Sequence, residues 1–322
     1  MNVQTITTTS RRIVQDRLPR GIQNWIIAAI LVALALVPLF ADPFTVRMAT
    51  LAAIGAILAL SLNLLYGFAG QISFGHGGFY ALGAYGAAIA CKYLIPDMAV
   101  AVPVAIVVTV VIGSVMGAPV LRLRDHFLGL ATLALGLVIY TVLNQWIEVT
   151  GGPSGMSIPP TQLFGLKLDS TAYHLLVVVI VAIVVVGIST LVNSKVGWAL
   201  RALKADEAAA ASVGINVLRY KVFAFGISAG IAALGGSLYA FLDNYIAPET
   251  FGIQASIMIL TMVVVGGLGS NLGAVIGGAL FISLPTLFIE IQEYQQLIYG
   301  LVLLLFILFL PGGIAGRQVR KG

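Results

Sequence analysis

The feature that most constrains this chain is a series of long apolar segments that follow one another with little polar sequence between them. A helix needs about 20 residues, at about 1.5 Å each, to cross the hydrocarbon of a bilayer. The apolar residues are continuous and do not alternate at every second position, which favours helices over a membrane β-barrel. We therefore predict an all-α, polytopic transmembrane bundle. The number of spans is about ten, and at least eight. The segments lie at approximately 24–41, 45–66, 72–91, 98–121, 127–147, 174–193, 219–241, 254–268, 272–289 and 295–311.

The composition agrees with a membrane protein and gives no sign of an enzyme. Apolar residues make up 60% of the 322 and charged residues 9%, whereas a soluble domain has roughly 25% charged residues. The single cysteine, Cys91, excludes an internal disulfide. No phosphate loop, zinc-protease motif or nucleophile elbow occurs in the sequence. We expect no cofactor in this chain, and we interpret its net charge of +5 as a topology signal and not as a sign of nucleic-acid binding.

The distribution of charges tests the segmentation. With a cytoplasmic N-terminus and ten spans, the cytoplasmic segments hold fourteen basic and four acidic residues, and the opposite side holds three basic and eight acidic residues. This is the asymmetry of the positive-inside rule, so both termini are predicted to be cytoplasmic. The expected organisation is a cytoplasmic tail at 1–23, one transmembrane domain at 24–316 and a cytoplasmic tail at 317–322. A cytoplasmic loop at 194–221 and an external loop at 148–173 interrupt the domain.

The longest polar interruption, Lys195 to Lys221, is predicted to contain a short helix. Ala199 to Ser212 is rich in strong helix formers, Gly214 can end that helix at positive φ, and Asn216 can cap the next one. The alanines expose almost no side chain, so another protein could approach the helix closely. A solvated helix between two spans is the alternative.

A second unusual segment lies at membrane depth, where five glycines occur between Gly67 and Gly78. Irregular backbone at that depth is tolerated where it is buried in protein or lines a watery cavity. Close helix packing is the alternative for the glycines. A similar glycine-rich pattern between Gly266 and Gly278 indicates a possible internal repeat. The residues predicted to line a substrate path are Asn63, Gln71, Ser73, Phe74 and His76.

The external loop contains a glycine-rich motif with two interpretations, a tight turn or a contact for an extracytoplasmic partner. It lacks the lysine of a phosphate loop, and it comprises Thr150, Gly151, Gly152, Pro153, Ser154 and Gly155. The predicted spans hold no Asp, Glu or Lys well inside the membrane, whereas ion-driven transporters usually need such groups. Any uphill transport is therefore expected to draw its energy from another subunit.

Four stretches together resemble the LivM-type permease subunits of branched-chain amino-acid ABC importers. They are residues 60–88, 150–156, 201–240 and 264–280, spread over most of the chain. In this class of importer a cytoplasmic E-A-A-x-x-x-G motif forms the coupling helix that docks into the ATPase. Ala208 to Gly214 matches that frame, with Glu207 one position before the glutamate of the motif.

The resemblance implies a transport subunit that binds no ATP itself. It implies a second homologous permease, two ATP-binding subunits, an extracytoplasmic substrate-binding protein and a place in the inner membrane. The residues then expected to couple to the ATPase are Arg201, Lys204, Ala205, Asp206, Glu207, Ala208, Ala209, Ala210 and Gly214.

Three alternatives stay open at this point. Relatives of such permeases carry urea or short amides, and nothing in these residues separates those substrates from leucine, isoleucine and valine. An ion-coupled secondary transporter would need intramembrane acids. A passive channel would fit the glycine-rich packing but would leave the cytoplasmic helix unexplained.

Overall fold

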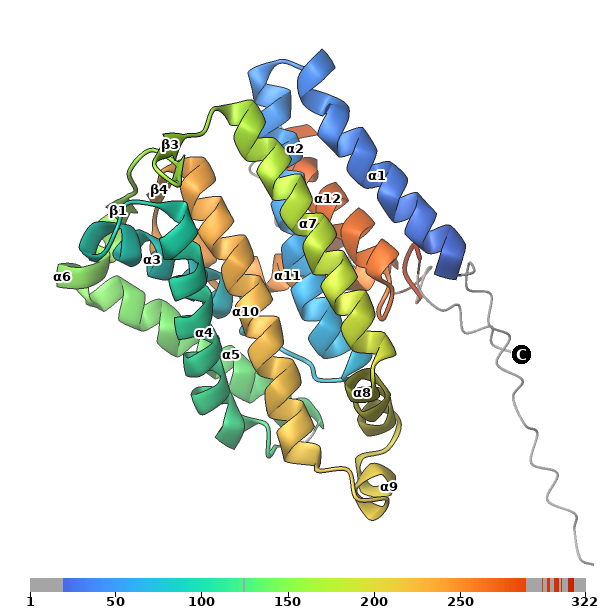
Figure 1. Ribbon diagram of the computed structural model, residues 1–322. Coiled ribbons are helices and arrows are strands. Elements are labelled where there is room, and N and C mark those ends of the chain that lie inside the picture. Colours follow the sequence, from blue (N-terminus) through green and yellow to red (C-terminus); the bar gives the residue numbers. More distant parts are fainter. Residues whose placement is uncertain are drawn as a thin grey trace, which may run out of the picture.

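The computed structural model describes residues 20–123, 125–287 and, beyond these, positions 297, 300, 301, 304–306, 308 and 312–315. Figure 1 shows long helices packed side by side in one bundle, which confirms the all-α, polytopic prediction. The long helices are α1 (Arg20–Phe40), α2 (Pro43–Leu62), α3 (His76–Tyr93), α4 (Met98–Val120), α5 (Asp125–Gln145), α7 (Ser170–Asn193), α10 (Val217–Asp243), α11 (Ile253–Gly266) and α12 (Asn271–Leu287).

Short elements occupy the two ends of the bundle. One end carries α8 (Lys195–Ala205) and α9 (Glu207–Ser212). The opposite end carries α6 (Ile147–Thr150), two 3-10 turns, η2 (Gly152–Ser154) and η3 (Pro248–Phe251), and two small antiparallel ribbons. In these ribbons β1 (Met156–Ser157) pairs with β4 (Tyr245–Ile246), and β2 (Gln162–Leu163) pairs with β3 (Leu166–Lys167).

Seven helical segments of the described chain are long and apolar enough to cross a membrane, namely Gly21–Leu39, Pro43–Phe68, Met98–Val120, Phe127–Gln145, Ser170–Asn193, Val217–Asp243 and Pro248–Gly266. They correspond to seven of the ten predicted spans. Two more predicted spans are α3 and the shorter α12. Most of the tenth, 295–311, and nearly all of both predicted tails fall outside the described residues, so the span count stays a prediction.

The centre of the bundle is built from α2, α3 and α10, whose small residues let the backbones touch. A Cβ added to Gly83 of α3 would lie 2.1 Å from the carbonyl oxygen of Ala233 in α10. A Cβ on Gly236 of α10 would lie 2.0 Å from the carbonyl oxygen of Tyr80. Gly55 of α2 approaches Gly278 of α12 in the same way. These glycines therefore serve close helix packing, which is how helices associate where no hydrophobic force drives them together.

The single helix predicted over Ala199 to Ser212 is wrong, because the structure breaks it at Asp206. Asp206 adopts an extended conformation (φ −162°, ψ 114°), and its carboxylate accepts hydrogen bonds from the backbone N–H groups of Ala208 and Ala209. Aspartate is a strong N-cap residue, and this local bonding competes with a continuous helix. The polar interruption therefore holds two helices, α8 and α9.

Candidate functional site

The polar interruption presents a small, exposed surface at one end of the bundle. On α9, Ala208 and Ala209 are exposed whereas Ala210 is buried against the protein. Val213, just after α9, is 76% exposed. The second exposed face is on α8, where the Arg201 guanidinium lies 4.7 Å from the centroid of the exposed Trp198 ring. The exposed side chains of this surface are therefore small on α9 and include a large aromatic ring on α8.

An ion pair anchors α9 to the membrane domain. The Glu207 carboxylate pairs with the ammonium group of Lys221, whose side chain is only 5% exposed. A buried ammonium without a counter-charge would be strongly destabilising, so the pair fixes the position of α9 relative to α10. This contact shows what Glu207 does one position before the glutamate of the motif: its carboxylate points back into the protein and holds α9 to α10.

The turn after α9 follows the predicted pattern. Gly214 has φ +86° and lies in open space, with no heavy atom within 4 Å of an added Cβ. Its N–H donates to Ala211, and the N–H of Ile215 donates to Ala210, which closes the end of α9. The side chain of Asn216 then accepts from the N–H of Arg219 and caps α10.

The other residues of the predicted coupling set lie at the junction of α8 and α9. Ala205 is the exposed last residue of α8. The ammonium group of Lys204 donates to the backbone oxygen of Gly67 at 2.5 Å. The Lys204 side chain therefore bonds to the membrane domain and does not extend freely into solvent.

The chain after α2 leaves the α-helical form and makes a π-helix, η1 (Asn63–Phe68). Wide turns of this kind occur frequently at functional sites. The buried Asn63 side chain accepts from the N–H of Gly269 at 2.8 Å and donates to the carbonyl of Ser270 at 3.2 Å. The structure therefore brings the two glycine-rich segments together, with Asn63 as their link and not as an open pore-lining group.

The non-helical segment between η1 and α3 carries the other predicted path residues. Gln71 and Ser73 are buried, and their side-chain polar atoms have no hydrogen-bond partner within the described chain. The Nδ1 atom of the buried His76 also lacks one, while its Nε2 lies 2.8 Å from the hydroxyl of Ser61. Phe74 is half-buried, and its N–H donates to Thr132 of α5.

Buried polar groups normally have partners. Within the described residues, buried side-chain atoms without a partner are concentrated in this segment, on three side chains within six residues. It is the place where water or a passing solute would gain hydrogen bonds.

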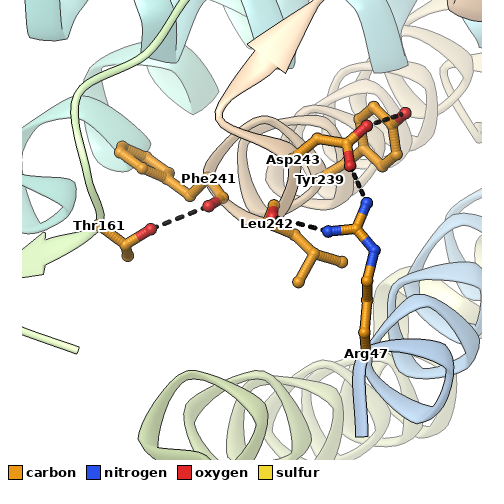
Figure 2. A network of polar contacts seen from close by, with 6 residues as sticks. All are labelled: Arg47, Thr161, Tyr239, Phe241, Leu242 and Asp243. Carbon is orange, nitrogen blue, oxygen red and sulfur yellow. Dashed lines mark hydrogen bonds and ion pairs between the residues drawn. The ribbon is translucent and has the colours of Figure 1, made fainter. Parts of the chain in front are cut away.

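The opposite end of the bundle holds a second ion pair, shown in Figure 2. The Arg47 guanidinium at the start of α2 pairs with the Asp243 carboxylate at the end of α10 and donates to the carbonyl of Leu242. The hydroxyl of Tyr239 donates to the other Asp243 oxygen at 2.7 Å, and Thr161 donates to the carbonyl of Phe241. Arg47 lines a cavity of about 470 Å³ between α2, α7 and α10. Arg47 thus joins α2 to α10.

The motif Thr150 to Gly155 is mainly a structural turn. Thr150 is buried and its hydroxyl donates to the carbonyl of Leu143, while Gly151, Gly152 and Gly155 all have positive φ. A Cβ on Gly155 would lie 2.1 Å from the carbonyl oxygen of Ile246, where β1 and β4 pair. Within this motif, only Pro153 and Ser154 are exposed.

Sequence reasoning missed the contacts made across the fold. Lys221, Ser61 and Gly67 each bind a predicted site residue, and no local motif marks them. A hydroxyl or an amide in an apolar span is the only hint that such a partner exists. No group of three or more His, Cys, Asp or Glu side chains within the described residues could hold a metal ion.

Comparisons with known proteins agree with this geometry. Residues 44–308 match the family described as branched-chain amino acid transport system, permease component. The chain belongs to this permease family. The high-affinity branched-chain amino acid transport permease LivM of Escherichia coli is 32% identical over 91% of this chain and 75% of its own length. LivH of the same organism is 27% identical over 84% of this chain and 94% of its own length.

A third relative is less similar to this chain. The probable LivM permease of Methanocaldococcus jannaschii is 24% identical over 86% of this chain and 85% of its own length. No solved structure matches the chain. This protein is therefore a multi-pass permease subunit of an importer in the inner membrane, a transport subunit and not a catalytic one.

Proposed function

We propose that this permease carries branched-chain amino acids inward as one of two homologous permeases, driven by two ATP-binding subunits. An extracytoplasmic binding protein delivers the substrate. The observation that carries this proposal is the α9 surface, a short capped helix with exposed alanines, anchored to α10 through Glu207 and Lys221. The similarity to LivM and LivH supplies the substrate class and the pairing of permeases.

The proposed topology places α8 and α9 in the cytoplasm together with both termini. Asn24 near the start of α1 and Asn193 at the end of α7 line one cavity, so these two helix ends share a side of the bundle. Near the C-terminus, Ile314 and Ala315 donate to the carbonyls of Val265 and Gly266 at the end of α11. Contacts of η1 with both α8 and the turn after α11 support the same side for these segments.

The proposed mechanism is alternating access powered in trans. Closure of the ATPase dimer would move α9 and reorient the helices around a path between the two permeases. We propose that this path is bordered by Gln71, Ser73 and His76, with Phe74 beside them. Asn63 would hold the segment in place through its hydrogen bonds to Gly269 and Ser270. Because no charged side chain of the described residues bonds to Gln71, Ser73 or His76, we expect weak binding of a zwitterion in the permease, with affinity set by the binding protein.

The proposed contact with the binding protein is the exposed part of the external loop. Pro153 and Ser154 are exposed at the tip of the glycine-rich turn. The neighbouring Thr150, Gly151, Gly152 and Gly155 would shape that turn and hold it in place.

The test is co-purification of the complex from mild detergent, with uptake measured in proteoliposomes. Ala209→Arg places a long charged side chain on the exposed face of α9 and should remove the ATP-binding subunits. Ser154→Arg adds the same charge at the opposite end of the molecule and should retain them. Uptake of labelled leucine and labelled urea would be compared in the same vesicles. Transport by the isolated permease without ATP would contradict the proposal and favour a secondary transporter.

A further inference from the structure

One contact joins the cytoplasmic helices to the irregular segment inside the bundle. Lys204 lies in the last turn of α8, and its ammonium group donates to the carbonyl oxygen of Gly67 in η1 at 2.5 Å. The stem of the same side chain lies over Gly70, where an added Cβ would be 2.9 Å from the Lys204 Cγ atom. Gly70 has φ +73°, so the chain turns sharply under the lysine.

A lysine near the C-terminus of a helix is favourable for the helix dipole alone. The dipole does not explain why the ammonium group reaches a carbonyl 137 residues away in the sequence. It also does not explain why the lysine stem packs closely on a second residue of the same segment. The contact has the geometry of a specific link between α8 and η1.

Gly67 is itself tightly held from the other side. A Cβ at Gly67 would lie 2.1 Å from the Asn63 side-chain oxygen and 2.5 Å from the backbone nitrogen of Gly269. Asn63 binds both Gly269 and Ser270. The backbone of η1 is therefore packed between α8 and the turn that joins α11 to α12. It cannot move relative to one of them without disturbing the other, because close-packed interfaces transmit displacement.

The segment directly beyond this packed point contains Gln71 and Ser73, the buried side chains without hydrogen-bond partners. It is not helical between Gly70 and Gly75, so no ladder of helical hydrogen bonds fixes its backbone. A displacement of η1 would shift these side chains first.

We propose that Lys204 is a positioning residue that passes the movement of α8 to the segment 67–75, and does so through the Gly67 carbonyl and not through contact with the ATPase. This inference rests on the proposed function, because it assumes that α8 and α9 move with ATP-binding subunits. It goes beyond that function by naming the link between the docking surface and the substrate path.

The experiment uses the assembled complex in proteoliposomes, with three variants. Lys204→Met keeps the length and packing of the stem but removes the donor. Lys204→Arg keeps a charged donor. Lys195→Met removes an exposed lysine at the other end of the same helix and serves as the matched control. Assembly with the ATP-binding subunits, ATP hydrolysis and leucine uptake are measured separately. Hydrogen exchange of residues 66–75 is compared with and without ATP.

We expect Lys204→Met to assemble and to hydrolyse ATP, while uptake per ATP falls about tenfold or more, the factor that corresponds to loss of one charged hydrogen bond. The change in exchange at 66–75 on ATP addition should disappear in this variant. Lys204→Arg should recover both, and Lys195→Met should match the wild type in both.

Other outcomes distinguish failure of the proposal for Lys204 from failure of the proposed function. Normal uptake per ATP in Lys204→Met would overturn the proposal that Lys204 passes the movement of α8 to the segment 67–75. Loss of the ATP-binding subunits in that variant would also overturn it, by placing Lys204 in the docking surface. Absence of ATP-dependent uptake in the wild-type complex would instead contradict the proposed function, whatever the variants do.

Discussion

The turn after α9 offers a direct way to disturb coupling without touching the packed core. Gly214 has φ +86° and open space around its α-carbon, so a side chain there meets no neighbour. A substitution therefore changes only the backbone preference. A residue with a Cβ loses about 1–2 kcal/mol in the left-handed region, and a β-branched residue is still less compatible with it.

The expected effect can be worked out from that cost. Every 1.4 kcal/mol is a factor of ten, so Gly214→Ala should lower the population of the observed turn by roughly five- to thirtyfold. Gly214→Val should lower it further. Gly214→Asn should have a much smaller effect, because asparagine adopts the left-handed conformation readily. The turn holds the end of α9 through the N–H groups of Gly214 and Ile215, so its loss would misplace the proposed docking surface.

The assay is titration of the ATP-binding subunits onto the two permeases held in nanodiscs, followed by uptake per ATP hydrolysed. Affinity and uptake should fall in the order Asn, Ala, Val, with insertion into the membrane unchanged. Gly187→Val in α7 is the matched control, since Gly187 also has no heavy atom within 4 Å of an added Cβ but does not have positive φ. Wild-type affinity and uptake in Gly214→Val would refute the argument that α9 acts through this turn.

Three further predictions follow from named contacts. Glu207→Gln should destabilise the α9–α10 junction by less than the roughly 3–5 kcal/mol of a fully buried pair, because Glu207 is partly exposed; thermal unfolding should show recovery when Lys221→Met is added. Asn63→Leu leaves the N–H of Gly269 unpaired, while the carbonyl of Ser270 still accepts from the N–H of Ala274; this variant should cost about 1–3 kcal/mol in the same assay, whereas Asn24→Leu at the exposed start of α1 should cost far less. Hydrogen bonds from the N–H groups of Ala99 and Gly165 lower the pKa of Asp97 from its ordinary value of 3.8, so this stabilisation is complete above about pH 4 and is lost as pH falls through the lowered pKa. The protection factors of the β2–β3 ribbon, which correct for the intrinsic pH dependence of hydrogen exchange, should therefore fall below pH 4 in the wild type, and unchanged protection factors would contradict the assignment.

Local signals in the sequence predicted much of the fold. Apolar continuity identified the long helices to within a few residues, and Gly214 and Asn216 occupy the positions that their capping preferences predict. The break at Asp206 was missed because helix formers lie on both sides of it. An aspartate in such a run can face solvent or cap a new helix, and local propensity alone does not decide between the two.

The candidate site was less accessible to sequence reasoning, because its decisive contacts join distant segments. Asn63 was predicted as a path residue from its place in an apolar span, but its actual partners, Gly269 and Ser270, lie more than 200 residues away in the chain. The external turn could be predicted from its glycines, because glycine adopts positive φ readily. That Gly155 packs on the backbone of Ile246 depends on how α10 ends, which no local pattern reports.

The two ion pairs described above have a common member in α10. Lys221 near its start pairs with Glu207 of α9, and Asp243 at its end pairs with Arg47 of α2. A helix of 27 residues is roughly 40 Å long, so these contacts lie at opposite ends of the bundle. Between them α10 packs backbone to backbone on α3 through Gly236. A displacement of α9 at one end is therefore resisted by α10 or transmitted along it. The far end of α10 borders the cavity beside Arg47. Because α8 contacts η1 and α9 contacts α10, the proposed docking surface would have two separate routes into the membrane domain. Loss of either route alone should impair transport without abolishing docking.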